Sequence, residues 1–292
     1  MTAPNEPVAD ALARLYDVDL LQDPGDLDLY LALAARTGGP ILELGVGSGR
    51  IAVPLAAAGY DVTGVDLDPA MLRRARERAA NAGRTAARNL TLVEADARGV
   101  GAAEVGGPFR LAFVALNSLL VFGSRADQRR TLQTMAGHLA PGGLAVVDVW
   151  LPDADDLARY DGRLGLEYTR RDPDSGNLVV KLASAYHDAA TSTVDLTAIF
   201  EEGRQGQPSR RWVREDRLRL VGADELRGFA EDAGLTVEIL AGSYDLAPLG
   251  PGDDRAVLVS TCTTTGANRE RSRTTTRGAV EPAGSGDLSG LV

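Results

Sequence analysis

One glycine-rich stretch constrains the fold of this chain more than any other part of the sequence. Residues 41–44 form a short apolar run with a single acid, which is typical of a strand buried on both faces. Gly45, Gly47 and Gly49 follow at alternate positions, and residues 51–58 then have the composition of a helix. A strand, a glycine turn and a helix N-terminus bring bare backbone N–H groups and the positive end of the helix dipole against a ligand. The stretch therefore predicts the binding site of a small ligand.

Further strand-like segments alternate with helical segments after the glycine turn. They are found at residues 61–66, 89–93, 109–116 and 144–150. This alternation is typical of βαβ units arranged around a parallel sheet. A helix and two more strands return near the end, so we expect an α/β fold with a doubly wound, mostly parallel sheet. Its core should comprise residues 39–158 and 221–263.

Three regions should lie outside this core. Residues 1–38 contain two amphipathic helical segments and are expected to form an N-terminal helical lid. Residues 159–220 contain strand-like runs separated by polar turns, which predicts an antiparallel β insertion that covers a substrate pocket. Residues 264–292 are rich in Thr, Arg, Gly and Ser, have little to bury, and are expected to be disordered.

Composition excludes several classes of function. The 292 residues are 44% hydrophobic and 25% charged, as in ordinary globular proteins, and the formal net charge is −10. An acidic surface repels phosphate backbones, so nucleic acid is not expected as a partner. One cysteine and two histidines predict neither a disulfide framework nor a zinc or histidine-based metal site. We find no signal peptide and no apolar run of membrane-spanning length, so we expect a cytoplasmic protein without membrane partners.

Acidic side chains at two strand ends indicate what the small ligand contains. Asp66, at the end of the second predicted strand, can accept hydrogen bonds from both hydroxyls of a ribose. Asp96, just after the third, can accept one from the exocyclic amine of adenine. Leu67, Met71 and Ala97 are the neighbouring apolar residues that could enclose the ring. The predicted ligand therefore carries adenosine.

These segments resemble the class I S-adenosylmethionine-dependent methyltransferases of the small-molecule type. ELGVGSGR, GVDLDPAML and EADA match successive cofactor motifs of that family in the right order, and the resemblance is close over residues 39–150. It implies a Rossmann-like core that binds S-adenosyl-L-methionine, with Asp66 at the ribose and the fourth strand beside the methyl group. Arg110 replaces the acid that the family usually carries early in that strand. The cofactor-binding residues that it implies are Glu43, Gly45, Gly47, Gly49, Asp66, Leu67, Met71, Asp96, Ala97 and Leu116.

Three residues are candidates for the catalytic side of the site, and each has a structural alternative. Asn117 directly follows the fourth strand and could equally be a turn cap. Tyr16 could close over the cofactor or simply pack in the core. His187 has a suitable pKa for a base but lies in what reads as a solvated hairpin tip. Further substrate-side candidates are Trp150, Tyr168 and Tyr186.

The predicted reaction is in-line displacement, in which a methyl group passes from S-adenosylmethionine to a small-molecule metabolite. Methyl transfer needs alignment of the nucleophile and exclusion of water, and it needs a base only if the nucleophile arrives protonated. The sequence does not choose between an oxygen and a nitrogen acceptor, nor does it predict an oligomeric state. The alternatives are a nicotinamide-dependent oxidoreductase, against which Arg50 and Asp96 count, and a non-catalytic module that binds S-adenosylmethionine.

Overall fold

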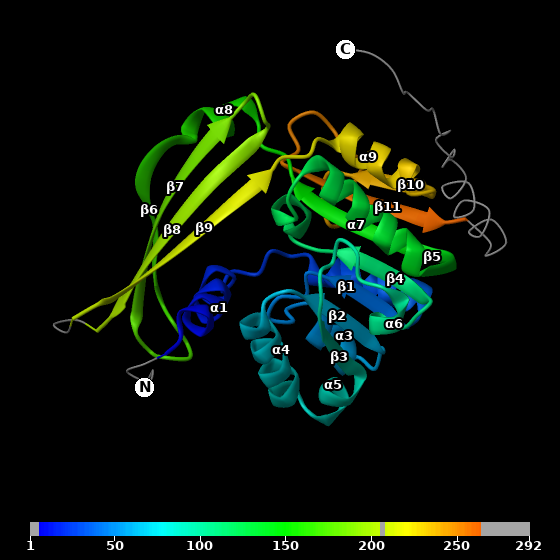
Figure 1. The fold of residues 1–292 in the computed structure, drawn as a ribbon, viewed down its shortest axis with the longest axis horizontal. Coiled ribbons are helices and arrows are strands. Elements are labelled where there is room, and N and C mark those ends of the chain that lie inside the picture. Colours follow the sequence, from blue (N-terminus) through cyan, green and yellow to red (C-terminus); the bar gives the residue numbers. More distant parts are fainter. Residues whose placement is uncertain (1–5, 205–207, 264–292) are drawn as a thin grey trace, which may run out of the picture.

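The computed structural model describes residues 6–204 and 208–263, which form two sheets and their flanking helices (Figure 1). The larger sheet has seven strands in the order β10-β11-β5-β4-β1-β2-β3. β1 pairs in parallel with both β2 and β4, whereas β11 is antiparallel to both of its neighbours. The predicted doubly wound, mostly parallel sheet is confirmed. The strands are β1 Ile41–Leu44, β2 Val62–Asp66, β3 Leu90–Glu94, β4 Phe109–Val114, β5 Leu139–Trp150, β10 Leu235–Ala241 and β11 Arg255–Cys262.

Helices cover both faces of this sheet, and strand residues alternate between two apolar clusters. Ala112 and Val114 of β4 belong to the cluster beneath α6, α7 and α9, whereas Leu111 and Phe113 face α2, α3, α4 and α5. Both faces are therefore buried, which explains why these strands read as apolar runs. The helices are α2 Leu27–Thr37, α3 Ala52–Ala57, α4 Pro69–Ala82, α5 Arg84–Asn89, α6 Ala102–Val105, α7 Arg125–His138 and α9 Ala223–Asp232.

The second sheet is antiparallel and separate, with the order β6-β7-β8-β9. Its strands are β6 Asp161–Arg171, β7 Leu178–Asp188, β8 Thr193–Gly203 and β9 Arg210–Arg219, and α8 Ala154–Arg159 precedes them. The predicted antiparallel sheet is confirmed, but the sequence did not reveal β6. Almost every residue of this edge strand is exposed, so it lacks the apolar alternation that marks a half-buried strand.

Helix α1, Val8–Asp19, lies between the two sheets (Figure 1). Leu15 and Val18 pack against Phe200 and Trp212 of the second sheet. The helix α2, in contrast, packs within the core beside β4 and α3. The proposed division into a lid of residues 1–38, a core and an insertion stays a prediction, and the predicted disorder of residues 264–292 lies outside the described residues.

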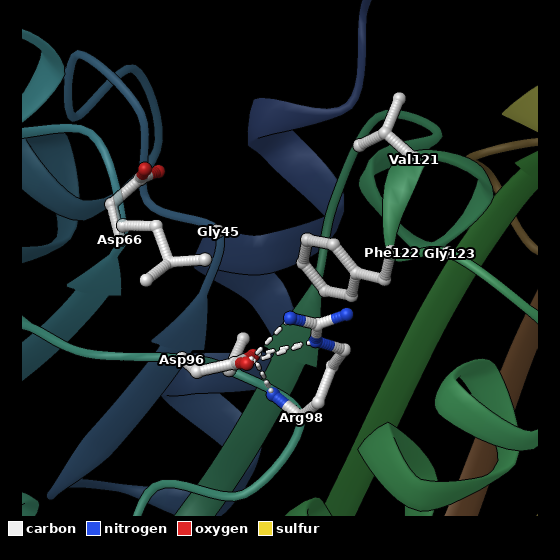
Figure 2. A pocket seen from close by; sticks show the side chains of 9 residues that line it. Gly45, Asp66, Asp96, Arg98, Val121, Phe122 and Gly123 are labelled. Atoms are coloured by element: carbon white, nitrogen blue, oxygen red, sulfur yellow. Dashed lines mark hydrogen bonds and ion pairs between the residues drawn. The ribbon is translucent and has the colours of Figure 1, made fainter. Parts of the chain in front are cut away.

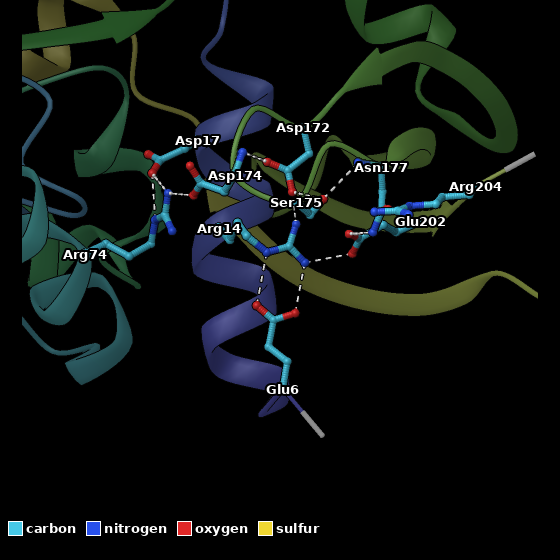
Figure 3. Close-up of polar contacts among 10 residues, drawn as sticks. All are labelled: Glu6, Arg14, Asp17, Arg74, Asp172, Asp174, Ser175, Asn177, Glu202 and Arg204. Atoms are coloured by element: carbon cyan, nitrogen blue, oxygen red, sulfur yellow. Dashed lines mark hydrogen bonds and ion pairs between the residues drawn. The ribbon is translucent and has the colours of Figure 1, made fainter. Parts of the chain in front are cut away.

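Arg14 joins α1 to the second sheet through buried ion pairs (Figure 3). Its guanidinium contacts the carboxylates of Asp172 and Glu202, the latter at 2.7 Å, and all three side chains are at most 5% exposed. Glu6 adds a further pair at 3.0 Å. Buried charges need partners because solvent cannot compensate them, so this cluster couples the position of α1 to that of the sheet.

The other side of α1 meets the core through ion pairs that are closer to solvent. Asp17 accepts from Arg74 of α4 at 2.6 Å (Figure 3). It also accepts from Arg78 of the same helix at 3.0 Å. It also accepts from the hydroxyl of Ser48, in the glycine turn, at 2.5 Å. Asp10 pairs with Arg73, both well exposed. Because exposed pairs are screened by water and salt, this side of α1 is the more weakly held.

Replacing Arg14 with alanine should lower the free energy of unfolding by about 3–5 kcal/mol, because Asp172 and Glu202 would be left buried without a cation. Denaturant unfolding followed by circular dichroism measures this change. The matched control is Arg73→Ala, which removes the more exposed ion pair between Arg73 of α4 and Asp10 of α1. This substitution should leave the free energy of unfolding unchanged. Equal effects of the two substitutions would contradict the buried role of Arg14.

Candidate functional site

The carboxyl ends of β1, β2, β3 and β4 meet at one edge of the sheet and surround a cavity of about 200 Å³ (Figure 2). β1 pairs with β2 on one side and with β4 on the other, so the order of the strands reverses at β1. In α/β proteins, ligands bind in the crevice that such a reversal opens. The residues that line the cavity are Gly45, Asp66, Leu67, Asp96, Ala97, Arg98, Val121, Phe122 and Gly123.

The glycine turn between β1 and α3 needs its glycines for two different reasons. Gly45, Gly47 and Gly49 all have left-handed backbones, with φ of 79°, 53° and 77°. A Cβ on Gly49 would lie 3.2 Å from that of Ala75, so this glycine permits close packing against α4. A Cβ on Gly47 would meet nothing within 4 Å, which leaves the backbone open to a ligand. Gly45 and Gly47 line the ligand space, whereas Gly49 does not.

Asp66 holds the glycine turn and still has capacity for a ligand. One of its carboxylate oxygens accepts from the Gly47 N–H at 2.8 Å and the other from the Asp68 N–H at 2.9 Å. Each carboxylate oxygen can accept a second bond, so two ribose hydroxyls can be added without breaking these two. Burial raises the pKa of Asp66 above its ordinary value, and the backbone N–H groups oppose this change.

Asp96 is paired with a residue that the sequence analysis did not single out. Its carboxylate accepts from Arg98 Nε at 2.8 Å and Nη2 at 2.6 Å, and Figure 2 shows this fork beside the ring of Phe122. The Arg98 side chain lowers the pKa of Asp96. Arg98 and Phe122 both line the cavity. Arg98 lies in the loop after β3 and Phe122 in the segment after β4, and no local pattern in the sequence predicts that the two meet.

A larger cleft of about 860 Å³ continues from this cavity and shares Gly45, Asp66, Val121 and Phe122 with it. It runs between α1, the glycine turn, the 3₁₀ helix η1 (Ser118–Val121) and the second sheet. This cleft brings together several predicted residues from distant parts of the chain, namely Tyr16, Met71, Leu116 and Asn117.

Tyr16 projects from α1 into this region among charged groups. Burial raises the pKa of its phenol, while the charges of Arg50 and Arg214 oppose this effect. The Arg214 guanidinium carbon lies 5.7 Å from the ring centroid. Arg50 stands at the position of the third glycine in the GxGxxG dinucleotide fingerprint. Its guanidinium is paired with the buried carboxylate of Asp26 at 2.5 and 2.6 Å. Tyr16 therefore stays protonated near neutral pH and can donate a hydrogen bond.

Two predicted residues lie away from the ligand space. Glu43 is 3% exposed in the wall behind the turn, and burial raises the pKa of its carboxyl well above the ordinary range. One of its oxygens, Oε2, has no hydrogen-bond partner among the described residues. His187 lies near the end of β7, where its backbone N–H donates to the Tyr160 carbonyl, and it lines neither space.

Asn117 lines the cleft but its side chain is already engaged. Its amide oxygen accepts from the Trp150 N–H of β5 at 2.5 Å, and it makes no capping hydrogen bond to the 3₁₀ helix η1 that follows. The Tyr168 hydroxyl contacts Asp19 at 2.5 Å, and Tyr186 is largely exposed. The catalytic roles of Asn117, Tyr16 and His187 stay predictions.

Residues 6–204 and 208–263 contain neither a metal-binding cluster nor a membrane-spanning helix. No group of three or more His, Cys, Asp and Glu side chains there is arranged to hold a metal ion. In the same ranges, no helix has the length and apolar character needed to cross a membrane.

The fold and this site define an α/β domain with a ligand-sized cavity at the carboxyl ends of its parallel strands, and comparisons with known proteins make the class more specific. Residues 41–143 match a family model described as a methyltransferase domain. The chain is 32% identical over 140 residues to the carboxy-S-adenosyl-L-methionine synthase of Chromohalobacter salexigens, covering 46% of this chain and 49% of that protein. It is 50% identical over 48 residues to the uncharacterized protein Rv1403c of Mycobacterium tuberculosis, 16% of this chain. The chain thus spans about half of the length of the Chromohalobacter protein and only 18% of the length of Rv1403c.

Solved structures match over much more of the chain. The CcbJ methyltransferase of Streptomyces caelestis is 26% identical, with a TM-score of 0.71 over 89% of this chain and all of that one. At 20% identity, the sugar N-methyltransferase KedS8 of Streptoalloteichus has a TM-score of 0.66 and covers 89% and 96% of the two chains. The amino pentose methyltransferase CalS10 of Micromonospora echinaspora, solved with S-adenosylmethionine bound, has a TM-score of 0.64 at 20% identity and covers 90% and 100%.

Residues 41–143 thus match a methyltransferase domain, and the chain shares its fold with methyltransferases, one of them solved with S-adenosylmethionine bound, which supports S-adenosylmethionine as the cofactor. The residues present fit that group. Gly47 leaves the turn open, Asp66 keeps free lone pairs, and Arg98, Asp96 and Phe122 surround the adjoining cavity. Nothing in the comparisons supports the nicotinamide alternative.

Asp66→Ala should weaken the binding of S-adenosylmethionine by about 1–3 kcal/mol, because ribose hydroxyls would lose their acceptor. Isothermal titration calorimetry measures this directly. Asp61→Ala is the matched control, since Asp61 is exposed just before the opposite end of the same strand. Unchanged affinity in Asp66→Ala would show that the ribose binds elsewhere, and tight binding of NAD instead of S-adenosylmethionine would contradict the cofactor.

The affinity for S-adenosylmethionine should fall as the pH is lowered through the raised pKa of Asp66. Ribose hydroxyls donate to the ionised carboxylate, so binding favours the form that has lost its proton. Calorimetry across a pH series should show a decline that begins above 3.8, the ordinary value for aspartate, and that Asp66→Asn removes. A decline of equal size in Asp66→Asn would assign the pH dependence to another group.

Proposed function

We propose that this protein transfers a methyl group from S-adenosylmethionine to a small-molecule metabolite, at an amine nitrogen in preference to an oxygen. The observation that carries this proposal is the 860 Å³ cleft, which joins the cofactor cavity to the inner face of the second sheet. Its volume is in the range of small-molecule sites. An acceptor in this cleft would lie between the glycine turn and β7, β8 and β9, enclosed by α1.

The charges along the cleft favour a cationic acceptor. Five carboxylates and two cations line it: Asp19, Asp66, Asp68, Glu215, Asp216, Lys181 and Arg214. A cleft with an excess of one sign concentrates ligands of the opposite sign. Amines are protonated and positively charged in neutral solution, so the carboxylates of the cleft attract them. Alcohols are uncharged and gain no such attraction. KedS8 and CalS10, whose folds are similar, are named as a sugar N-methyltransferase and an amino pentose methyltransferase, which accords with an amine.

The bound cofactor supplies a methyl group on a sulfonium, which is already activated toward nucleophiles. The tasks left to the protein are binding, alignment and exclusion of water. Asp66 would hold the ribose of the cofactor, and the Gly45–Gly47 backbone would hold its methionine part. Apolar side chains of α1 and the second sheet, among them Leu12 and Phe200, exclude water from the adjoining cleft.

The proton of an amine acceptor must leave before the reaction, because a protonated amine has no lone pair to attack with. None of the residues that line the cleft is a histidine. Asp19 and Asp216 are carboxylates in the cleft, but both are held by cations, Lys181 at 3.1 Å and Arg214 at 2.7 Å. The rate should therefore follow the ionisation of the amine itself more closely than that of Asp19 or Asp216.

A screen of paired acceptors tests this proposal. Amino sugars and other small amines are offered beside the analogues in which a hydroxyl replaces the amine, and release of S-adenosylhomocysteine is measured. We expect turnover of amines at least about tenfold above that of their hydroxyl partners. Turnover of hydroxyl compounds alone would contradict the nitrogen acceptor. Binding of S-adenosylmethionine without turnover of any acceptor would favour the non-catalytic binding module.

A further inference from the structure

The backbone directly after β4 is strained at the wall of the cleft. Leu116 and Asn117 are both left-handed, with φ of 47° and 64°, although neither is a glycine. This conformation is uncommon for a residue with a Cβ, and it is rarer still for leucine than for asparagine. Both residues line the cleft, opposite the second sheet. Strained residues of this kind persist only where the surrounding structure holds them.

Strand β5 holds both residues. The carboxylate of Asp148 accepts from the Leu116 N–H, at 3.0 Å to one oxygen and 3.1 Å to the other. The Asp148 backbone carbonyl accepts from the Asn117 N–H at 3.3 Å. Two residues later, the Trp150 N–H donates to the Asn117 side chain. The end of β5 therefore clamps the two left-handed residues from one side.

Asp148 is itself fixed from three further elements. Its side chain is 0% exposed, and its oxygens accept from the hydroxyl of Tyr30 in α2 at 2.7 Å and from that of Tyr244 at 3.1 Å. Arg255 of β11 lies 3.5 Å away. A buried carboxylate contributes less to stability than an apolar side chain of similar volume. What it provides that an apolar residue cannot is a directed acceptor for the Leu116 N–H.

One backbone group of this turn remains available. Among the described residues, no donor bonds to the carbonyl oxygen of Leu116, whereas the carbonyls of Ala115 and Asn117 accept from Ser118 and Leu120. A backbone carbonyl without an internal partner can accept a hydrogen bond from an N–H of a ligand, and Leu116 is among the residues that line the cleft. The left-handed conformation decides where this oxygen lies.

We propose that Asp148 is a positioning residue for the methyl acceptor. It acts through the Leu116–Asn117 backbone, which it holds so that the Leu116 carbonyl accepts an N–H of the amine and orients its lone pair. The cofactor site at Asp66 and the glycine turn does not depend on it. This inference rests on the proposed function, because it assumes an amine acceptor in the cleft.

Four variants test the inference with an amine that the wild type methylates. Asp148→Ala should lower kcat about 100-fold, whereas Asp148→Asn, whose amide oxygen can still accept the Leu116 N–H, should lose clearly less. Tyr30→Phe removes one of the bonds that fix the same carboxylate but leaves its bond to the Leu116 N–H, so it should lower kcat clearly less than Asp148→Ala. In all three the dissociation constant for S-adenosylmethionine should stay within about threefold. Leu116→Gly, which removes the strain, should reduce the loss caused by Asp148→Ala.

Amide hydrogen exchange gives a readout that needs no acceptor. Exchange at Leu116 and Asn117 should accelerate in Asp148→Ala while the protection of β1 and β2 is retained, which also shows that the variant folds. Unchanged exchange at Leu116 would overturn the clamp. A loss of S-adenosylmethionine affinity as large as the loss of kcat, or an equal loss of kcat in Tyr30→Phe, would overturn the positioning role. Failure of the wild type to methylate any amine would instead contradict the proposed function.

Discussion

The parallel pairing of β1 with both β2 and β4 is the constraint on which the rest of this structure depends. Because parallel strands present their carboxyl ends at one edge, four chain segments that are far apart in sequence deliver their loops to the same place. The glycine turn begins directly after β1, Asp66 is the last residue of β2, and Asp96 and Leu116 are the second residues after β3 and β4. The cofactor site is therefore a direct consequence of the order of the strands.

Electrostatic interactions determine how the second sheet is attached to this core. Arg14 is buried with its partners on the second sheet, whereas Asp17 meets Arg74 and Arg78 closer to solvent. The helix α1 thus belongs more firmly to the second sheet than to the core. Since Asp17 also binds Ser48 of the glycine turn, the same helix contacts both the cofactor turn and the acceptor cleft.

The sequence predicted those parts of the fold and site that depend on local patterns. The Gly45–Gly49 turn directly follows the buried strand β1 and Asp66 ends β2, so their positions could be inferred from neighbouring residues. Strand β6 could not be inferred, because it is exposed along almost its whole length. Arg98 and Phe122 reach the cavity only because loops after β3 and β4 fold toward each other. Arg14 lies 158 and 188 residues from Asp172 and Glu202, so no sequence window contains their interaction.

The separation between the two sheets has a consequence for how such a protein can change. One sheet carries the cofactor turn, and the other supplies Leu196, Ala198 and Arg214 to the far wall of the cleft. Side chains on that wall can be exchanged without altering any residue that contacts the glycine turn. Selectivity for the acceptor can thus diverge rapidly, by mutation or by design, on a scaffold whose chemistry stays constant.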